Sequence, residues 1–120
     1  MAFTGTLTTE EEIDFFAGAN ASPSVTEANK NTLTAQAEAY LNVLGKYDFV
    51  SNYASLNDEQ KQILSEYCAR LAAIGIISYD MSTYTSRIEA EDMINIHWAR
   101  LNKIEEKIRE QNFVKQITDN

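Results

Sequence analysis

The sequence predicts an all-α fold: a small bundle of about four helices with a long C-terminal helix and a terminal tail. Apolar residues recur at spacings of three and four through the longer segments, which is the period of one helix face. Residues that cap helix N-termini, among them Thr9, Asn57 and Ser86, stand directly before these segments. Strand signals are weak, because FVSNY and IGIISYD could be short extended pieces but no hairpin dipeptide separates alternating runs.

The N-terminal part predicts an arm followed by a short helix. Residues 1–8 are expected to be irregular or extended. Thr9 then has the chemistry of an N-cap, and the glutamates after it stand in the first turn, where carboxylates favour the positive helix end. Thr9 and Glu12 have capping-box spacing. The helix is expected to continue through Phe16, with Gly18 ending it.

A second helix is expected from about residues 25–27 to Leu44, after the only segment that contains proline. Its first half is rich in small and polar side chains, so that half could be partly solvated or lie against another subunit. Gly45 is a candidate for the residue that follows the helix. The apolar positions of this helix are Leu33, Ala37, Tyr40, Leu41 and Leu44.

The third helix is predicted to be the most buried one. The aromatic segment 46–56 precedes it and is expected to cover one end of the core. Asn57 and Gln60 have capping-box spacing and mark its start. The helix should run to about Ile74, with Gly75 ending or bending it. Its wide apolar stripe consists of Ile63, Leu64, Tyr67, Cys68, Leu71 and Ile74.

The fourth helix is predicted over residues 86–111. A helix of this length spans roughly 39 Å at 1.5 Å per residue, so part of it is expected to project from a domain this small toward a partner. Trp98 lies on its apolar stripe, where it could serve the core or anchor an interface. The stripe is Ile94, Trp98, Leu101, Ile104 and Ile108, and the basic residues of the outer half are Arg100, Lys103, Lys107 and Arg109.

Residues 112–120 form a polar tail that nevertheless carries Phe113, Val114 and Ile117. Such an apolar triad suits a docking segment, and the alternative is a terminus that folds back on its own domain. The predicted interface therefore combines the outer half of the last helix with the tail: Trp98, Arg100, Lys103, Lys107, Arg109, Phe113, Val114 and Ile117.

Composition indicates one globular domain, residues 1–120, with a strongly acidic charge. The formal net charge is −8, and residues 1–60 contribute nine acidic against two basic side chains. Phosphate backbones repel such a chain, so binding to nucleic acid is disfavoured, whereas the asymmetry suits either a solvated surface or head-to-tail contact between copies. No signal peptide and no apolar run long enough to span a bilayer is visible.

Catalytic and metal-binding patterns are thin, and we expect neither an enzyme nor a cofactor. His97 is the only histidine and Cys68 the only cysteine, so a histidine pair for zinc and an intrachain disulfide are both excluded. Cys68 stands on a core stripe and is expected to be a buried, inert thiol. The four glycines are isolated, so no phosphate-binding loop exists. Acidic residues interleave with the bases of the last helix, which weakens a DNA-recognition reading.

Residues 76–96, IISYDMSTYTSRIEAEDMINI, resemble small proteins encoded among the virion structural genes of tailed bacteriophages. The segment NYASL before the third helix, the ISYDMS turn and the TSRIEAEDMIN helix start carry the resemblance, which covers about residues 50–96. The layout of the chain is similar to that of head–tail adaptor (connector) proteins, which are short, all-helical and free of disulfides.

The resemblance implies a structural role in the virion, at the head–tail interface, after synthesis in the cytoplasm of a bacterial host. Adaptors of this kind bind beneath the portal protein as a ring, usually of twelve copies, and contact a downstream tail or stopper protein. DNA only passes through their channel, and no membrane is involved. The alternatives are another virion part, such as a tail completion or decoration protein, or a small helical regulator that binds DNA or protein.

Overall fold

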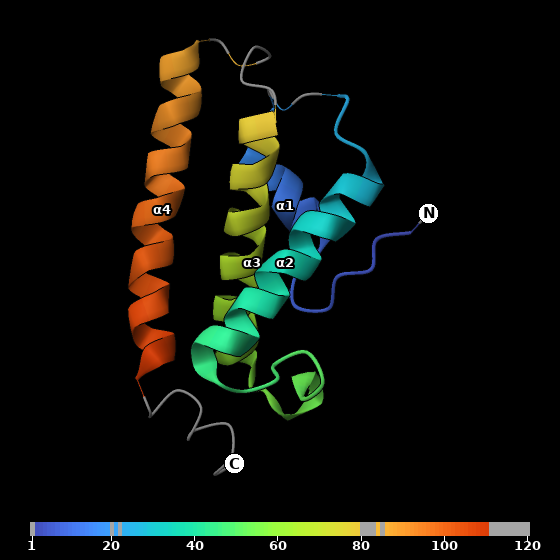
Figure 1. The fold of residues 1–120 in the computed structure, drawn as a ribbon, viewed down its shortest axis with the longest axis vertical. Coiled ribbons are helices and arrows are strands. Elements are labelled where there is room, and N and C mark those ends of the chain that lie inside the picture. Colours follow the sequence, from blue (N-terminus) through green and yellow to red (C-terminus); the bar gives the residue numbers. More distant parts are fainter. Residues whose placement is uncertain (1, 20, 22, 80–83, 85, 111–120) are drawn as a thin grey trace.

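The computed structural model describes residues 2–19, 21, 23–79, 84 and 86–110. Within these residues the chain is helical and contains no strand, which confirms the all-α prediction (Figure 1). The elements are α1 (Glu10–Ala17), α2 (Glu27–Gly45), the 3-10 turn η1 (Tyr53–Ser55), α3 (Asp58–Tyr79) and α4 (Arg87–Arg109).

The central helix is α3, against which α1, α2 and α4 all pack (Figure 1). Ten of its residues are buried, more than in any other helix that the structure describes, so the prediction that it is the most buried helix is confirmed. Cys68 is fully buried, as expected. Ile63 and Leu71 were expected in the stripe but are only partly buried, at the margin of the core.

Local capping explains where the helices begin. The Thr9 side chain accepts a hydrogen bond from the backbone N–H of Glu12 at 3.2 Å. Asn57 and Gln60 form the predicted capping box, with distances of 2.8 and 3.0 Å. Ser86 accepts from the third backbone N–H after it at 3.0 Å. Each cap satisfies backbone donors that the first helical turn leaves without an intrahelical acceptor.

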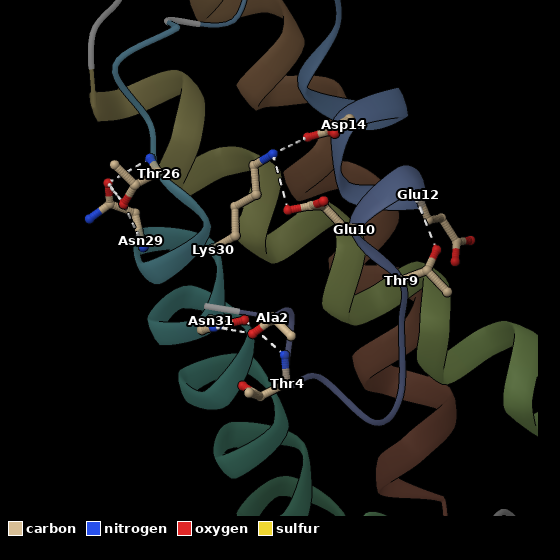
Figure 2. A network of polar contacts seen from close by, with 10 residues as sticks. All are labelled: Ala2, Thr4, Thr9, Glu10, Glu12, Asp14, Thr26, Asn29, Lys30 and Asn31. Atoms are coloured by element: carbon tan, nitrogen blue, oxygen red, sulfur yellow. Dashed lines mark hydrogen bonds and ion pairs between the residues drawn. The ribbon is translucent and has the colours of Figure 1, made fainter.

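The N-terminal arm is tied to α2 by side chains that accept and donate backbone hydrogen bonds. Asn31 accepts from the N–H of Thr4 at 2.9 Å and donates to the carbonyl of Ala2 at 3.0 Å (Figure 2). The Glu38 carboxylate accepts from the N–H groups of Thr6 and Leu7, both at 2.8 Å. These bonds hold the irregular arm in place, and the Leu7 side chain is buried in the core.

Lys30 links α2 to α1. Its ammonium lies 2.8 Å from the carboxylate of Asp14 and 3.6 Å from that of Glu10 (Figure 2). The Glu12 side chain does not complete the predicted capping box with Thr9. Its carboxylate instead accepts hydrogen bonds from Thr8 and from Ser65 on α3. The acidic first turn of α1 is therefore used for tertiary contacts as well as for the helix end.

Two glycines have other roles than those predicted. α3 continues through Gly75 to Tyr79, and a Cβ at Gly75 would lie 2.6 Å from the side chain of Leu33. The glycine therefore allows α2 and α3 to approach closely. Gly45 is the last residue of α2, and Lys46 adopts the left-handed conformation at φ 53°. A Cβ at Gly45 would lie 2.7 Å from the ring of Phe49, so the ring needs this glycine.

α4 packs along its length, so the expectation that its outer half projects is wrong. Buried residues run from Ala90 near its start to Ile108 near its end. The C-terminal half of α4 packs against the aromatic segment 46–56. Phe49 of this segment is fully buried in the same cluster as Leu101 and Ile108. That segment extends the core beyond the ends of α2 and α3, and thereby gives the last turns of α4 a surface to cover.

Candidate functional site

Three spaces between helices surround α3, and they differ in chemistry. The space between α1 and α2 is closed by the N-terminal arm and by Lys30. A polar groove lies on the α1–α4 side and an apolar groove on the α2–α4 side. These two grooves are concave surfaces of the described residues at which a partner or ligand could be held.

The polar groove has a volume of about 680 Å³ and is lined by the arm, α1, α3 and α4. Glu66 is one of its lining residues and binds two arginines. It accepts from Nε of Arg70 at 2.8 Å, and from Nε and NH2 of Arg100 at 2.6 and 3.1 Å. The Arg100 contact is bidentate and joins α4 to α3, which is a stronger geometry than a single ion pair.

His97 continues this network toward α1. Its Nε2 lies 3.0 Å from the carbonyl oxygen of Phe16, so Nε2 must carry the proton and donate. Its Nδ1 is then an acceptor, 3.0 Å from NH1 of Arg70. The Arg70 guanidinium also lies 4.4 Å from the centre of the Phe16 ring. One neutral histidine thereby connects α1, α3 and α4.

The electrostatics of the network follow from these contacts. Desolvation lowers the pKa of His97 below the ordinary 6.5; the Phe16 carbonyl opposes this shift and the charge of Arg70 adds to it. For Glu66, desolvation opposes ionisation, but the hydrogen bonds from Arg100 and Arg70 outweigh it and hold the pKa of the carboxyl below its ordinary value. The network is therefore held together by an ionised glutamate and a neutral histidine.

Stability should decrease as the pH falls through the range in which His97 titrates. The lowered pKa means that the unfolded chain binds the proton first, so the stabilisation is present above about pH 6.5 and is lost below it. One proton limits the slope to about 1.4 kcal/mol per pH unit. The measurement is the free energy of unfolding by urea between about pH 7.5 and 5.5. Histidine is the side chain whose ordinary pKa lies in this range, and His97 is the only histidine of the chain.

His97→Gln is the matched control for this pH dependence. The amide keeps a donor and an acceptor but cannot gain a proton, so the slope between about pH 7.5 and 5.5 should disappear. If the wild-type chain instead gains stability toward lower pH, His97 is not held neutral and the assigned proton position is wrong.

The apolar groove has a volume of about 450 Å³, with α3 as its floor and α2 and α4 as its walls. Among the lining residues that the structure describes, Glu105 is the only charged one, and it accepts a hydrogen bond from the hydroxyl of Tyr67 at 2.7 Å. Desolvation, and after it this hydrogen bond, raise the pKa of Tyr67. The lining is Leu33, Gln36, Ala37, Tyr40, Tyr67, Leu71, Ile74, Gly75, Trp98 and Glu105.

The predicted interface residues do not form one patch. Trp98 lines the apolar groove with 41% of its surface exposed, whereas Arg100 lines the polar groove and is bound to Glu66. Lys103 is exposed, and Lys107 and Arg109 pair within the chain, at 3.5 Å with Glu110 and at 4.0 Å with Glu105. Phe113, Val114 and Ile117 lie outside the described residues.

Leu101, Ile104 and Ile108 of the predicted α4 stripe are buried, but near the middle of the helix His97 is buried in place of Trp98. His97 is 5% exposed, and Trp98 lies at the edge of the packed face. The reason is that α4 contacts α1 through His97 as well as α3, so its packed face is wider than a single stripe. The Glu66–Arg70 pair went unnoticed in the sequence, although its spacing of four residues on a helix is a recognisable signal.

Large apolar side chains are also exposed on each of the four described α-helices. The most exposed are Phe15 on α1 at 78%, Val43 on α2 at 75%, and Ile88 and Ile96 on α4 at 70% and 64%. Single exposed apolar residues are common on monomers. Here the exposed apolar residues include Phe15 on α1 and Val43 on α2, and both helices pack against α3. The chain therefore offers two different apolar surfaces for contact with a partner.

Among the described residues, no group of three or more histidine, cysteine, aspartate or glutamate side chains is placed to hold a metal ion. The described helices also include none that is long and apolar enough to cross a membrane. No protein-family model, curated protein or solved structure matched the chain. Its function is therefore inferred from its own residues and surfaces.

Proposed function

We propose that the chain is a non-enzymatic structural protein of a tailed-phage virion, a head–tail adaptor that assembles as a ring between the portal and the tail components. The resemblance over residues 50–96 supports this proposal, as does the short all-helical layout. Adaptors of this kind bind other proteins through their surfaces and need no reaction centre.

The observation that carries the proposal is the exposure of large apolar side chains on different sides of α3. A closed ring with more than two copies needs two different surfaces on each subunit, because the contact is head-to-tail. Phe15 on α1 and Val43 on α2 offer such a pair, since α1 packs in one buried cluster and the C-terminal half of α2 packs in another. Burying both kinds of surface would favour association.

The charge distribution supports the passage of DNA rather than its binding. The net charge of −8 repels phosphate groups, which suits a channel through which DNA moves. Three basic residues of α4, Arg100, Lys107 and Arg109, do not contribute to a free basic face either, because they pair with acidic residues of the chain. Of the alternatives, a DNA-binding regulator is therefore the less supported.

Phe15→Glu tests the proposed contact between copies. The side chain is 78% exposed, so the change should alter the free energy of unfolding by less than about 0.5 kcal/mol. A charge in an apolar contact costs several times more, so self-association should fall at least about tenfold. The measurement is the mass in solution by light scattering, over a range of protein concentrations.

Glu11→Gln is the control, because Glu11 is also exposed on α1 and this change likewise alters the net charge by one unit. It should leave the association state unchanged. A wild-type chain that remains monomeric at the highest concentrations would count against a ring that forms from this chain alone. Equal association of the wild type and Phe15→Glu would remove α1 from the contact.

A further inference from the structure

Of the three spaces around α3, the α1–α2 space is closed by the chain itself, the α1–α4 groove is polar, and the α2–α4 groove is apolar. The arm and Lys30 close the α1–α2 space, and the contact between His97 and Phe16 crosses the α1–α4 space. The α2–α4 groove contains aromatic and aliphatic side chains, among them Tyr40 at 45% and Trp98 at 41% exposure. Covering such a surface with another apolar segment lowers the free energy, because apolar area is removed from water.

We propose that the chain's own C-terminal segment, residues 112–118, occupies this apolar groove. The occupant must be apolar with little charge, and the segment carries Phe113, Val114 and Ile117. Residues 111–118 contain a single charged side chain, Lys115, and the described groove lining contains a single charged side chain, Glu105. The two charges are opposite, so the segment and the groove match in polarity and in sign.

The segment can reach the groove from the end of α4. Trp98 lies eleven residues before Arg109, which is roughly 16 Å along a helix. The eight residues from 110 to 117 span about 26 Å when extended, which is enough to turn back and pass Trp98. Glu105, one turn before the end of α4, marks the near end of the groove.

An attached segment also has an advantage over a separate one. A short flexible linker holds its segment at an effective concentration of the order of millimolar. A segment from a second copy would have to be present at a similar concentration to compete. This inference concerns the free chain and does not depend on the proposed ring.

The test is disulfide trapping between the segment and each groove. Gln116→Cys is combined with Gln36→Cys, which places the second thiol in the apolar groove, or with Gln62→Cys, which places it in the polar groove. Both positions are exposed, and Gln62 stands one turn before Glu66, whose partner Arg100 lies on α4. The native Cys68 is fully buried and burial raises the pKa of its thiol, so it should not interfere.

Under mild oxidation at low protein concentration, the Gln36→Cys pair should close within one chain at least about tenfold faster than the Gln62→Cys pair. Adding Phe113→Asp should abolish this preference without affecting the helical core, because Phe113 lies beyond α4. Equal rates for the two pairs, or no disulfide at Gln36→Cys, would overturn the proposal. A disulfide that joins two chains would also overturn it and would assign the groove to a second copy.

Discussion

Phe49→Ala is expected to lower the free energy of unfolding by about 3–5 kcal/mol, the range for removing a buried aromatic ring. Phe49 has no exposed surface, and its ring packs at Gly45, against Tyr47 and near Ile108. The backbone is held as well, since the Phe49 N–H donates to Asn42 at 2.9 Å. Because the side chains around the ring are already packed, we expect that they cannot fill the space it leaves and that its loss creates a cavity.

Chemical denaturation with urea measures this effect, and Val43→Ala is the control. Val43 lies near the C-terminal end of α2 but is 75% exposed, so its truncation should change the free energy of unfolding by less than about 0.5 kcal/mol. A loss below about 1 kcal/mol for Phe49→Ala would show that the segment 46–56 does not cover the end of the core.

Leu101→Ala is expected to cost about 2–5 kcal/mol, as for other buried leucines. Leu101 is fully buried in the middle of α4 and belongs to the cluster shared with α2 and α3. The variant therefore tests whether α4 is packed along its length. Thermal or urea unfolding followed by the helical circular dichroism signal is suitable, because most described residues are helical.

Ile96→Ala is the matched control on the same helix, since Ile96 is 64% exposed and its truncation should cost less than about 0.5 kcal/mol. Similar small losses for both variants would mean that α4 is only loosely attached. That outcome would restore the expectation of a projecting helix, which the burial from Ala90 to Ile108 contradicts.

The helix starts could be predicted because their causes are local. Thr9, Asn57 and Ser86 each cap the helix that follows them, and the partners stand three residues away in the sequence. Apolar periodicity likewise predicted a deeply buried third helix, which is confirmed in α3. These features depend on neighbouring residues, so a single sequence contains them.

The roles of glycine could not be predicted because they depend on tertiary contacts. Gly75 has the appearance of a helix end, but it stands inside α3 to admit Leu33 of α2. Gly45 likewise admits the Phe49 ring, while Lys46 takes the left-handed position. In both cases the deciding neighbour comes from another element, so the local signal was misleading.

The polar network around Glu66 could likewise be predicted only where its contacts are local in the sequence. Glu66 and Arg70 are four residues apart, so their pair could be predicted from helical spacing. The bond between His97 and the carbonyl of Phe16 joins residues 81 positions apart, and Arg100 lies 34 positions from Glu66. Only the packing of α4 against α1 and α3 brings these groups together, which is why Arg100 was expected at an interface and this contact of His97 was not predicted.

Electron cryo-microscopy of the purified full chain at high concentration tests the proposed function most directly. The account predicts closed rings around a central channel, with a mass of about twelve times the 13.5 kDa chain if the number of copies follows the resemblance. The subunit contacts should include the exposed side chain of Phe15 on α1 and that of Val43 on α2 of the neighbour. Particles that are only monomers or two-fold symmetric dimers at every concentration would contradict it.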